Sequence, residues 1–267
     1  LKEEIKKTKD PEKKNELRST YYGIVFFVAT GMFIQAGGVP WVLGDKLSAN
    51  CHIGIDVGGE DARVACYGYL FDQIGRLIGT EVGTAQTGEL VESGRVKRAI
   101  LKLMSMIKPK HGMKIIITRD GRLLEEERQG IKEAIEEYLS PEIRQSLKLA
   151  IVEIRKNVPF RIYDIVDRRI KNPLIGRYAL IDKNTAVLCT TGYPLITQGV
   201  ADPLLIYIHN MYGELETHEI FQDILYLSQL NWVAMDKPSK LPVTISLAEA
   251  RALFAEKGIT PASKLPV

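Results

Sequence analysis

The sequence contains few cysteines and no large excess of either charge. Cys51, Cys66 and Cys189 are the only cysteines among 267 residues. They are widely spaced and form no Cys-x-x-Cys pair, so neither a zinc site nor a disulfide framework is indicated, and we expect a reducing, cytoplasmic setting. Lys and Arg number 36 against 33 Asp and Glu, a net charge of +3. Any nucleic-acid site must therefore be a local patch rather than the whole surface.

The composition also lacks the biases of disordered, collagenous and coiled-coil proteins. Hydrophobic residues make up 45% of the chain, and no internal repeat or low-complexity segment is visible. A chain of this length is able to bury a sizeable core in one large domain. It begins with Leu1 rather than methionine, from which we expect a fragment whose upstream part is missing.

An uncharged stretch at 19–44 is long enough to cross a bilayer. A membrane span is the alternative to consider, but the stretch contains an internal glutamine, several glycines and a proline, and no signal-peptide pattern precedes it. The pattern favours a buried helix at 20–36, a glycine break and a short strand at 39–43. No membrane partner is expected.

The rest of the chain alternates between strand and helix patterns. Short apolar segments at 53–57, 62–69 and 76–82, the last two joined by a turn, predict an antiparallel meander. Strands are then expected at 114–118, 149–154, 178–182, 185–189 and 204–208, and helices at 95–107, 122–139, 217–230 and 247–257. The charged residues 2–18 indicate a solvated helix end or a linker. This order predicts an α/β fold, a ribonuclease H-like mixed sheet flanked by helices.

Two aspartates stand at the ends of predicted central strands. Asp56 lies in HIGIDVGG, and Asp120 lies in IIITRDG. If the strands are adjacent, both carboxylates meet at one edge of the sheet, where a divalent cation such as Mg²⁺ or Mn²⁺ would neutralise them. The alternative is that each aspartate ends its strand and starts a turn with a following glycine.

These segments belong to a longer series that resembles a known family. AGGVPWVL, HIGIDVGG, IIITRDG, VPFRIYD, IGRYALID, LCTTG, LSQLNW and LPVTISLAEA resemble, in this order, landmarks of the PIWI domain of prokaryotic Argonautes. The resemblance covers about residues 20–257. It implies that 1–48 are the C-terminal part of a Rossmann-like MID domain with a linker, and that 49–267 are the ribonuclease H-like PIWI domain. The remaining Argonaute domains would lie outside this chain.

The resemblance implies a guide-directed endonuclease that cuts a complementary strand with two metal ions. Their ligands in the family are Asp, Glu, Asp and a fourth Asp, His or Asn, and Asp56 and Asp120 match the first and third positions. Glu89 fits the second position best, with Glu92 as the alternative, although either could be a solvated acid at a helix start. Glu249 falls at the fourth position, unless it is merely an exposed residue of the last helix.

The resemblance also implies contacts with a guide, either RNA or DNA, and with a complementary target. Gln35 falls where MID domains commonly have a lysine for the guide's 5′-phosphate, and Asp202 falls where relatives usually have arginine. A neutral amide cannot replace an ammonium, so we expect either a 5′-hydroxyl guide or compensation from outside the chain. The candidate phosphate contacts, unless they are solvated surface, are Arg155, Lys156, Arg161, Arg168, Arg169, Lys171 and Arg177.

Two other classes of function remain open at this stage. A guide-loaded protein that binds its target without cutting would result if Glu249 fails to complete the site. A sugar-kinase or chaperone-type ATPase is suggested by GIDVGG, which also resembles a phosphate loop, but the sequence lacks the second such loop. The histidines lack metal-ligand spacing, and His52 is expected to be structural.

Overall fold

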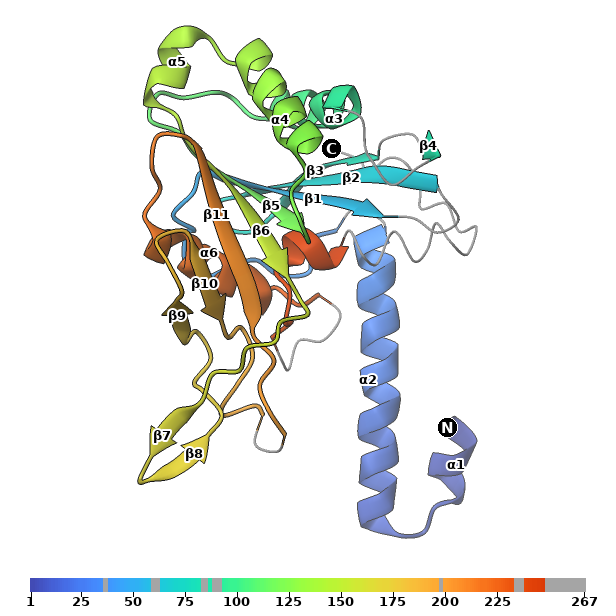
Figure 1. Ribbon diagram of the computed structural model, residues 1–267. Helices are drawn as coiled ribbons and strands as arrows, with labels where there is room; N and C mark the ends of the chain where they lie inside the picture. The colour runs from blue at the N-terminus through green and yellow to red at the C-terminus, as the bar shows by residue number, and fades with distance from the viewer. Residues whose placement is uncertain are drawn as a thin grey trace.

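The computed structural model describes residues 1–35, 38–58, 63–82, 86–87, 93–196, 199–232 and 238–247. Within these residues, a nine-stranded mixed sheet forms the body of the protein (Figure 1). Its strand order is β3-β2-β1-β5-β6-β11-β10-β9, and β4 pairs with β2 at one end. A separate two-stranded hairpin, β7-β8, extends beyond the sheet (Figure 1).

The strands of the sheet are β1 (Cys51–Gly58), β2 (Arg63–Asp72), β3 (Leu77–Val82), β4 (Gln86–Thr87), β5 (Lys114–Asp120), β6 (Lys148–Arg155), β9 (Tyr178–Leu180), β10 (Thr185–Leu188) and β11 (Leu204–Tyr212). The hairpin consists of β7 (Asp164–Val166) and β8 (Arg169–Lys171). The helices are α1 (Lys2–Lys7), α2 (Pro11–Gln35), α3 (Ser93–Met104), α4 (Glu125–Tyr138), α5 (Pro141–Ser146) and α6 (Thr217–Gln229).

The sheet combines an antiparallel meander with a parallel centre. β1, β2 and β3 pair antiparallel in sequence order, as predicted. β1 then pairs parallel with β5, and β5 pairs parallel with β6. β11 returns antiparallel to β6 and continues into β10 and β9. The predicted α/β fold, a mixed sheet flanked by helices, is confirmed.

Helices cover both faces of the central strands, which explains the continuous apolar run of β5. Ile115 and Ile117 belong to the core beneath α3 and α4, whereas Ile116 belongs to the core beneath α6. Successive strand residues point to opposite faces, so a strand that is covered on both sides needs apolar residues throughout. The stripe on α3 that includes Val96 and Ile100 is fully buried.

Helix α2 differs from the buried helix expected at 20–36. It is one continuous helix that starts at Pro11, so the charged residues from Pro11 onward, expected to form a solvated helix end or a linker, belong to the helix. It projects away from the sheet (Figure 1), and its apolar side chains are largely exposed, with Tyr22 at 66% and Met32 at 69%. Lys, Glu, Leu and Arg before the apolar part all favour helix, so nothing stops the helix between them. Among the described residues, no helix has the combined length and apolarity that a membrane crossing requires.

Two further expectations need correction or completion, and one element was not predicted. The short strand at 39–43 does not form: Leu43 N–H donates to the carbonyl of Ile74, but Pro40 lacks a donor for a strand ladder. The last helix starts at residue 243 rather than 247, and its predicted part beyond 247 lies outside the described residues. The β7-β8 hairpin was not predicted, because its turn contains no glycine. Its turn residues Asp167 and Arg168 nevertheless have positive φ values of 51° and 59°.

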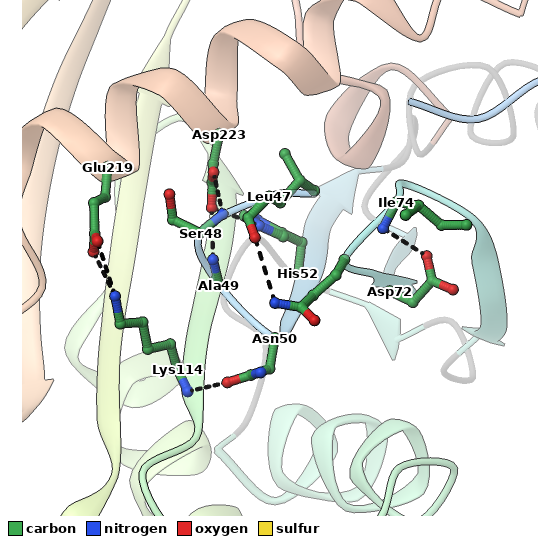
Figure 2. A network of polar contacts seen from close by, with 11 residues as sticks. Leu47, Ser48, Ala49, Asn50, His52, Asp72, Ile74, Lys114, Glu219 and Asp223 are labelled. Atoms are coloured by element: carbon green, nitrogen blue, oxygen red, sulfur yellow. Dashed lines mark hydrogen bonds and ion pairs between the residues drawn. The ribbon is translucent and has the colours of Figure 1, made fainter. Parts of the chain in front are cut away.

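A buried aspartate on α6 ties the segment before β1 to the sheet. Figure 2 shows Asp223 directed at Ser48, Ala49 and His52. Its Oδ1 accepts a hydrogen bond from Ser48 N–H at 2.8 Å, and its Oδ2 accepts one from Ala49 N–H at 2.9 Å. His52 Nε2 lies 3.0 Å from Oδ2, and both side chains are almost completely buried. An ionised carboxylate only accepts, so Nε2 is the donor, and the expectation that His52 is structural is confirmed.

The same contacts set the acidity of this carboxyl group. Burial by itself would raise the pKa of Asp223, but the hydrogen bond and charge of His52 and the two backbone donors outweigh burial and lower that pKa below its ordinary value. A folded-state pKa below the unfolded one contributes stability above the unfolded pKa, and this contribution is lost as the pH falls through the folded pKa.

Asp223→Ala should lower the free energy of unfolding by about 3 kcal/mol, because it leaves buried donors without an acceptor. Urea denaturation at neutral pH measures this loss, and the difference between parent and variant should shrink as the pH falls below about 4. Glu219→Ala is a matched control on the same helix: Glu219 forms a partly exposed ion pair with Lys114, and its loss should cost about 1 kcal/mol or less. Equal losses in the two variants would contradict a special role for Asp223.

Candidate active site at the ends of β1 and β5

Asp56 and Asp120 lie next to each other at the carboxyl ends of β1 and β5. The parallel register pairs Ile55 with Arg119, and each aspartate is the next residue along its strand. Neighbouring strands lie about 4.8 Å apart, so the two carboxylates share one edge of the sheet. Asp56 is 7% exposed, and the Asp120 side chain is 12% exposed. The expected meeting of two carboxylates is therefore present in the strand register.

A buried arginine contacts both aspartate residues. Arg119 Nη1 is 3.8 Å from Asp56 Oδ1 and also donates to the carbonyl oxygen of Asp120. The other side of its guanidinium binds Glu127 on α4, with Nε 3.1 Å from both carboxylate oxygens and Nη2 3.0 Å from Oε1. Glu127 is only 2% exposed and also accepts a hydrogen bond from Leu124 N–H. The start of α4 thus fixes the cation beside Asp56, a role that the sequence analysis missed.

A lysine provides the cation beside Asp120. Lys156 Nζ lies 2.7 Å from Asp120 Oδ2, and the lysine side chain is 31% exposed. Lys156 follows β6, and its own carbonyl oxygen accepts a hydrogen bond from Lys240 Nζ at 2.7 Å. Lys156 was expected to contact phosphate. The structure places its ammonium on the candidate catalytic carboxylate instead.

Two more of the predicted phosphate contacts also have partners within the protein. Arg155 Nη2 lies 2.9 Å from Glu153 Oε2, and its guanidinium lies 4.4 Å from the centre of the Tyr207 ring. Arg177 Nε lies 3.6 Å from Asp164 Oδ2 at the start of β7. These arginines would have to exchange or share a carboxylate in order to bind a phosphate.

Asp202, which was expected to repel a phosphate, is surrounded by cations. Arg161 Nη1 lies 3.6 Å from its Oδ1, and Lys240 Nζ contacts its Oδ2. Arg161 also donates to the carbonyl oxygens of Val158 and Phe160, both at 2.8 Å. The negative charge of Asp202 is therefore largely compensated within the protein.

Three predicted phosphate contacts from the segment DRRIK at 167–171, here called the DRRIK cluster, lie on the projecting β7-β8 hairpin. Arg168 is in its turn, and Arg169 and Lys171 are on β8, all of them exposed. The cross-strand pair of Ile165 and Ile170 on the same hairpin is 78% and 74% exposed. Among the ion pairs of the described residues, none joins this cluster to Asp56 or Asp120.

The side chains of four predicted site residues lie outside the described part of the structure. Glu89, Glu92 and Glu249 lie outside the described residues, and of Gln35 only the helical backbone at the end of α2 is described. Glu92 immediately precedes α3, whose first residue is Ser93. The assignments of these residues remain predictions.

The chain that leads to Glu249 is held against the two site strands. Thr118 Oγ1 on β5 donates to Thr244 Oγ1 at 2.8 Å, and a Cβ built on Gly54 of β1 would overlap the carbonyl oxygen of Thr244. Gly54 precedes Asp56 by two residues, and Thr118 precedes Asp120 by two. Residues two apart share one face of a strand, so this segment crosses the face on which the aspartates lie.

The described donors fit a hard divalent cation but do not complete a site for one. Asp56 and Asp120 supply the oxygen ligands that Mg²⁺ and Mn²⁺ prefer. In the described part of the chain, no group of three or more His, Cys, Asp or Glu residues is arranged to hold a metal ion. The other predicted ligands, Glu89 or Glu92 and Glu249, lie outside that part.

Comparisons with known proteins agree on one family, although no family model matches the chain. The protein argonaute of Aquifex aeolicus is 24% identical over 248 residues, which are 90% of this chain and 33% of that protein. A Piwi protein of Archaeoglobus fulgidus is 24% identical over 239 residues, 79% of this chain and 54% of that protein. The chain thus spans a third to about half the length of these relatives.

A solved structure shows the same similarity in three dimensions. Clostridium butyricum Argonaute, bound to a guide DNA and a 19-mer target DNA, matches with a TM-score of 0.73 and 25% identity. The match covers 95% of this chain and 32% of that one. The mixed sheet flanked by helices is thus the arrangement of the Argonaute PIWI region. In sequence and in fold, the chain is similar to the PIWI domain of prokaryotic Argonautes.

Proposed function

We propose that this chain carries the catalytic part of a guide-directed endonuclease that cuts a complementary nucleic-acid strand. One observation carries the proposal: Asp56 and Asp120 lie side by side toward the carboxyl ends of adjacent parallel strands, in a sheet similar to that of an Argonaute bound to guide and target DNA. The chain spans only about a third of that Argonaute, so guide and target, whether RNA or DNA, would also contact protein outside it.

Asp56, Asp120 and Glu249 would hold Mg²⁺ or Mn²⁺, with Glu89 or Glu92 completing the set. Bound divalent cations would supply an activated water and stabilise the leaving oxygen of the cleaved strand. Arg119 would keep Asp56 in position because Glu127 fixes its guanidinium from the opposite side. The segment at 243–247 would bring Glu249 toward the same edge, which its contacts with Gly54 and Thr118 support.

We further propose that 1–48 belong to a MID domain and that 49–267 form the PIWI domain. The exposed apolar side chains of α2 support this division, because a large exposed apolar surface normally marks an interface. Gln35 ends this helix and would lie near the 5′ end of a guide. Its neutral amide favours a 5′-hydroxyl guide over a phosphorylated one.

A second candidate function rests on Glu249 itself. Glutamate replaces the Asp, His or Asn that the family resemblance leads us to expect, and its extra methylene displaces the carboxylate by about 1 Å or more, enough to cost about a hundredfold in rate. A guide-loaded protein that binds its target without cutting would then be the result.

Asp56→Asn in the intact protein should slow cleavage of a guide-matched target by more than about a hundredfold, because it removes a metal ligand. Guide binding, measured by filter retention, should stay within about twofold of the parent, since phosphate contacts dominate affinity. Asp182→Asn removes the same charge from an exposed turn and is the matched control. Undiminished cutting by Asp56→Asn would remove this site from consideration.

Glu249→Ala should eliminate cleavage, whereas Glu249→Asp should increase its rate by restoring the shorter side chain. The parent should prefer Mn²⁺ over Mg²⁺, because Mg²⁺ demands near-ideal octahedral geometry. Single-turnover rates with each metal test both statements. If Glu249→Ala cuts as fast as the parent, the assignment is wrong, and if the parent cuts with neither metal, the non-cleaving binder is the better function.

Arg119→Met should lower the free energy of unfolding by about 3 kcal/mol, since Glu127 would remain charged and buried without its partner. Arg119→Met combined with Glu127→Leu should recover most of that stability. The double variant should still cleave more slowly, because Asp56 would lose its fixed neighbour. Parental cleavage by the double variant would mean that Arg119 has only a structural role.

A further inference from the structure

The two aspartates of the candidate site each have a protein cation beside them, and the two cations differ in their exposure to solvent. The Arg119 side chain is 10% exposed and is bound on two sides, by Glu127 and by the carbonyl oxygen of Asp120. The Lys156 side chain is 31% exposed, and its ammonium lies 2.7 Å from Asp120. A lysine has a flexible four-carbon stem, so Lys156 is the cation that is able to leave.

The backbone at Lys156 is anchored independently of its ammonium. Its carbonyl oxygen accepts a hydrogen bond from Lys240 Nζ, and Lys240 also contacts Asp202. The ammonium is therefore able to change partners without movement of the chain at the end of β6. Arg155, its neighbour, is paired with Glu153 and stacked on Tyr207, so its partner is not one of the proposed metal ligands.

An ammonium and a divalent cation compete for the same carboxylate. A metal ion bound to Asp120 while Lys156 stays in place would put two positive charges within a few ångströms of each other, which is unfavourable. A phosphate group within reach of Lys156 removes the conflict, because the ammonium pairs with the phosphate and Asp120 pairs with the metal. Whatever favours one of these two exchanges then favours the other, since coupling between binding sites is reciprocal.

We propose that Lys156 is a positioning residue that couples binding of a nucleic-acid phosphate to binding of the divalent cation. In the protein without nucleic acid, its ammonium holds Asp120 and weakens metal binding. A phosphodiester of the guide or the target attracts the ammonium and makes Asp120 accessible to the metal. This inference rests on the proposed endonuclease function and adds an order to it: the metal binds tightly only after the strand is in place.

The test compares Mn²⁺ affinity in the intact protein and its variants by electron paramagnetic resonance of free Mn²⁺. Without nucleic acid, Lys156→Met should bind Mn²⁺ about three- to tenfold more tightly than the parent, as expected for removal of a partly exposed ion pair. Lys156→Arg keeps the charge and should bind like the parent. Lys183→Met removes one charge from the exposed turn between β9 and β10, where Lys183 pairs with Glu214, and is the matched control, with no change expected.

The second part adds nucleic acid at a temperature at which no cleavage occurs, with oligonucleotide-only samples as the reference for Mn²⁺ bound to phosphates. Guide alone, or guide with target, should tighten Mn²⁺ binding to the parent severalfold and to Lys183→Met equally, but should have little effect on Lys156→Met. Tightening by guide alone assigns the phosphate to the guide, and tightening only after target addition assigns it to the target.

Two outcomes would overturn the inference, and they are distinguishable. If Lys156→Met binds Mn²⁺ like the parent while Asp120→Asn abolishes binding, Lys156 has no coupling role and the proposed nuclease site still stands. If Asp120→Asn leaves Mn²⁺ binding of the parent unchanged, the metal site itself is wrong, and the coupling is lost with it.

Discussion

The parallel pairing of β1 with β5 is the interaction on which the rest of the structure depends. These strands lie in the middle of the sheet and are covered on one face by α3 and α4. A register shift of one residue would exchange the two faces of a strand, moving the isoleucines of β5 out of their cores and separating Asp120 from the level of Asp56. The apolar packing that stabilises the fold therefore also holds the two carboxylates together.

This close approach of acids is balanced by cations that the fold itself supplies. Arg119 and Lys156 come from β5 and from the end of β6, the two strands that follow β1 in the sheet. Glu127 in turn requires Arg119, because a buried charge without a partner is strongly destabilising. The same principle recurs around Asp202, where Arg161 and Lys240 approach one carboxylate. Basic residues that look like phosphate contacts in the sequence are thus largely engaged within the protein.

Local patterns predicted the centre of the fold, because there they coincide with burial. The run of isoleucines in β5 and the stripe of α3 are consequences of cores that cover them, so both elements and the position of Asp120 followed from the sequence. α2 was misjudged because an apolar composition shows that a surface avoids water but not what covers it. The β7-β8 hairpin was missed because Asp167 and Arg168 adopt positive φ without the glycine that normally signals such a turn.

The ion pairs of the site could not be predicted from local sequence patterns, for a different reason. Lys156 and Asp120 are 36 positions apart in the chain, and which of several carboxylates a lysine selects is decided by sheet register and side-chain reach. A charged run in the sequence cannot distinguish a cation that waits for a ligand from one that already has a partner. The structural role of His52 was easier to predict, since an isolated histidine in an apolar strand without metal-ligand spacing usually has a structural partner. Here that partner is Asp223.

The contact between Gly54 and Thr244 has a consequence for how the sequence is able to diverge. It is an approach of one backbone to another, closer than any side chain at position 54 would allow, and only the absence of a Cβ is required. A single methyl group at Gly54 would push Thr244 away from β1, however well the neighbouring side chains fit. Val243 and Ile245 are buried in two different cores, so changes of their size would also disturb the segment. The path toward Glu249 therefore depends on the smallness of one residue as well as on the apolar side chains beside Thr244.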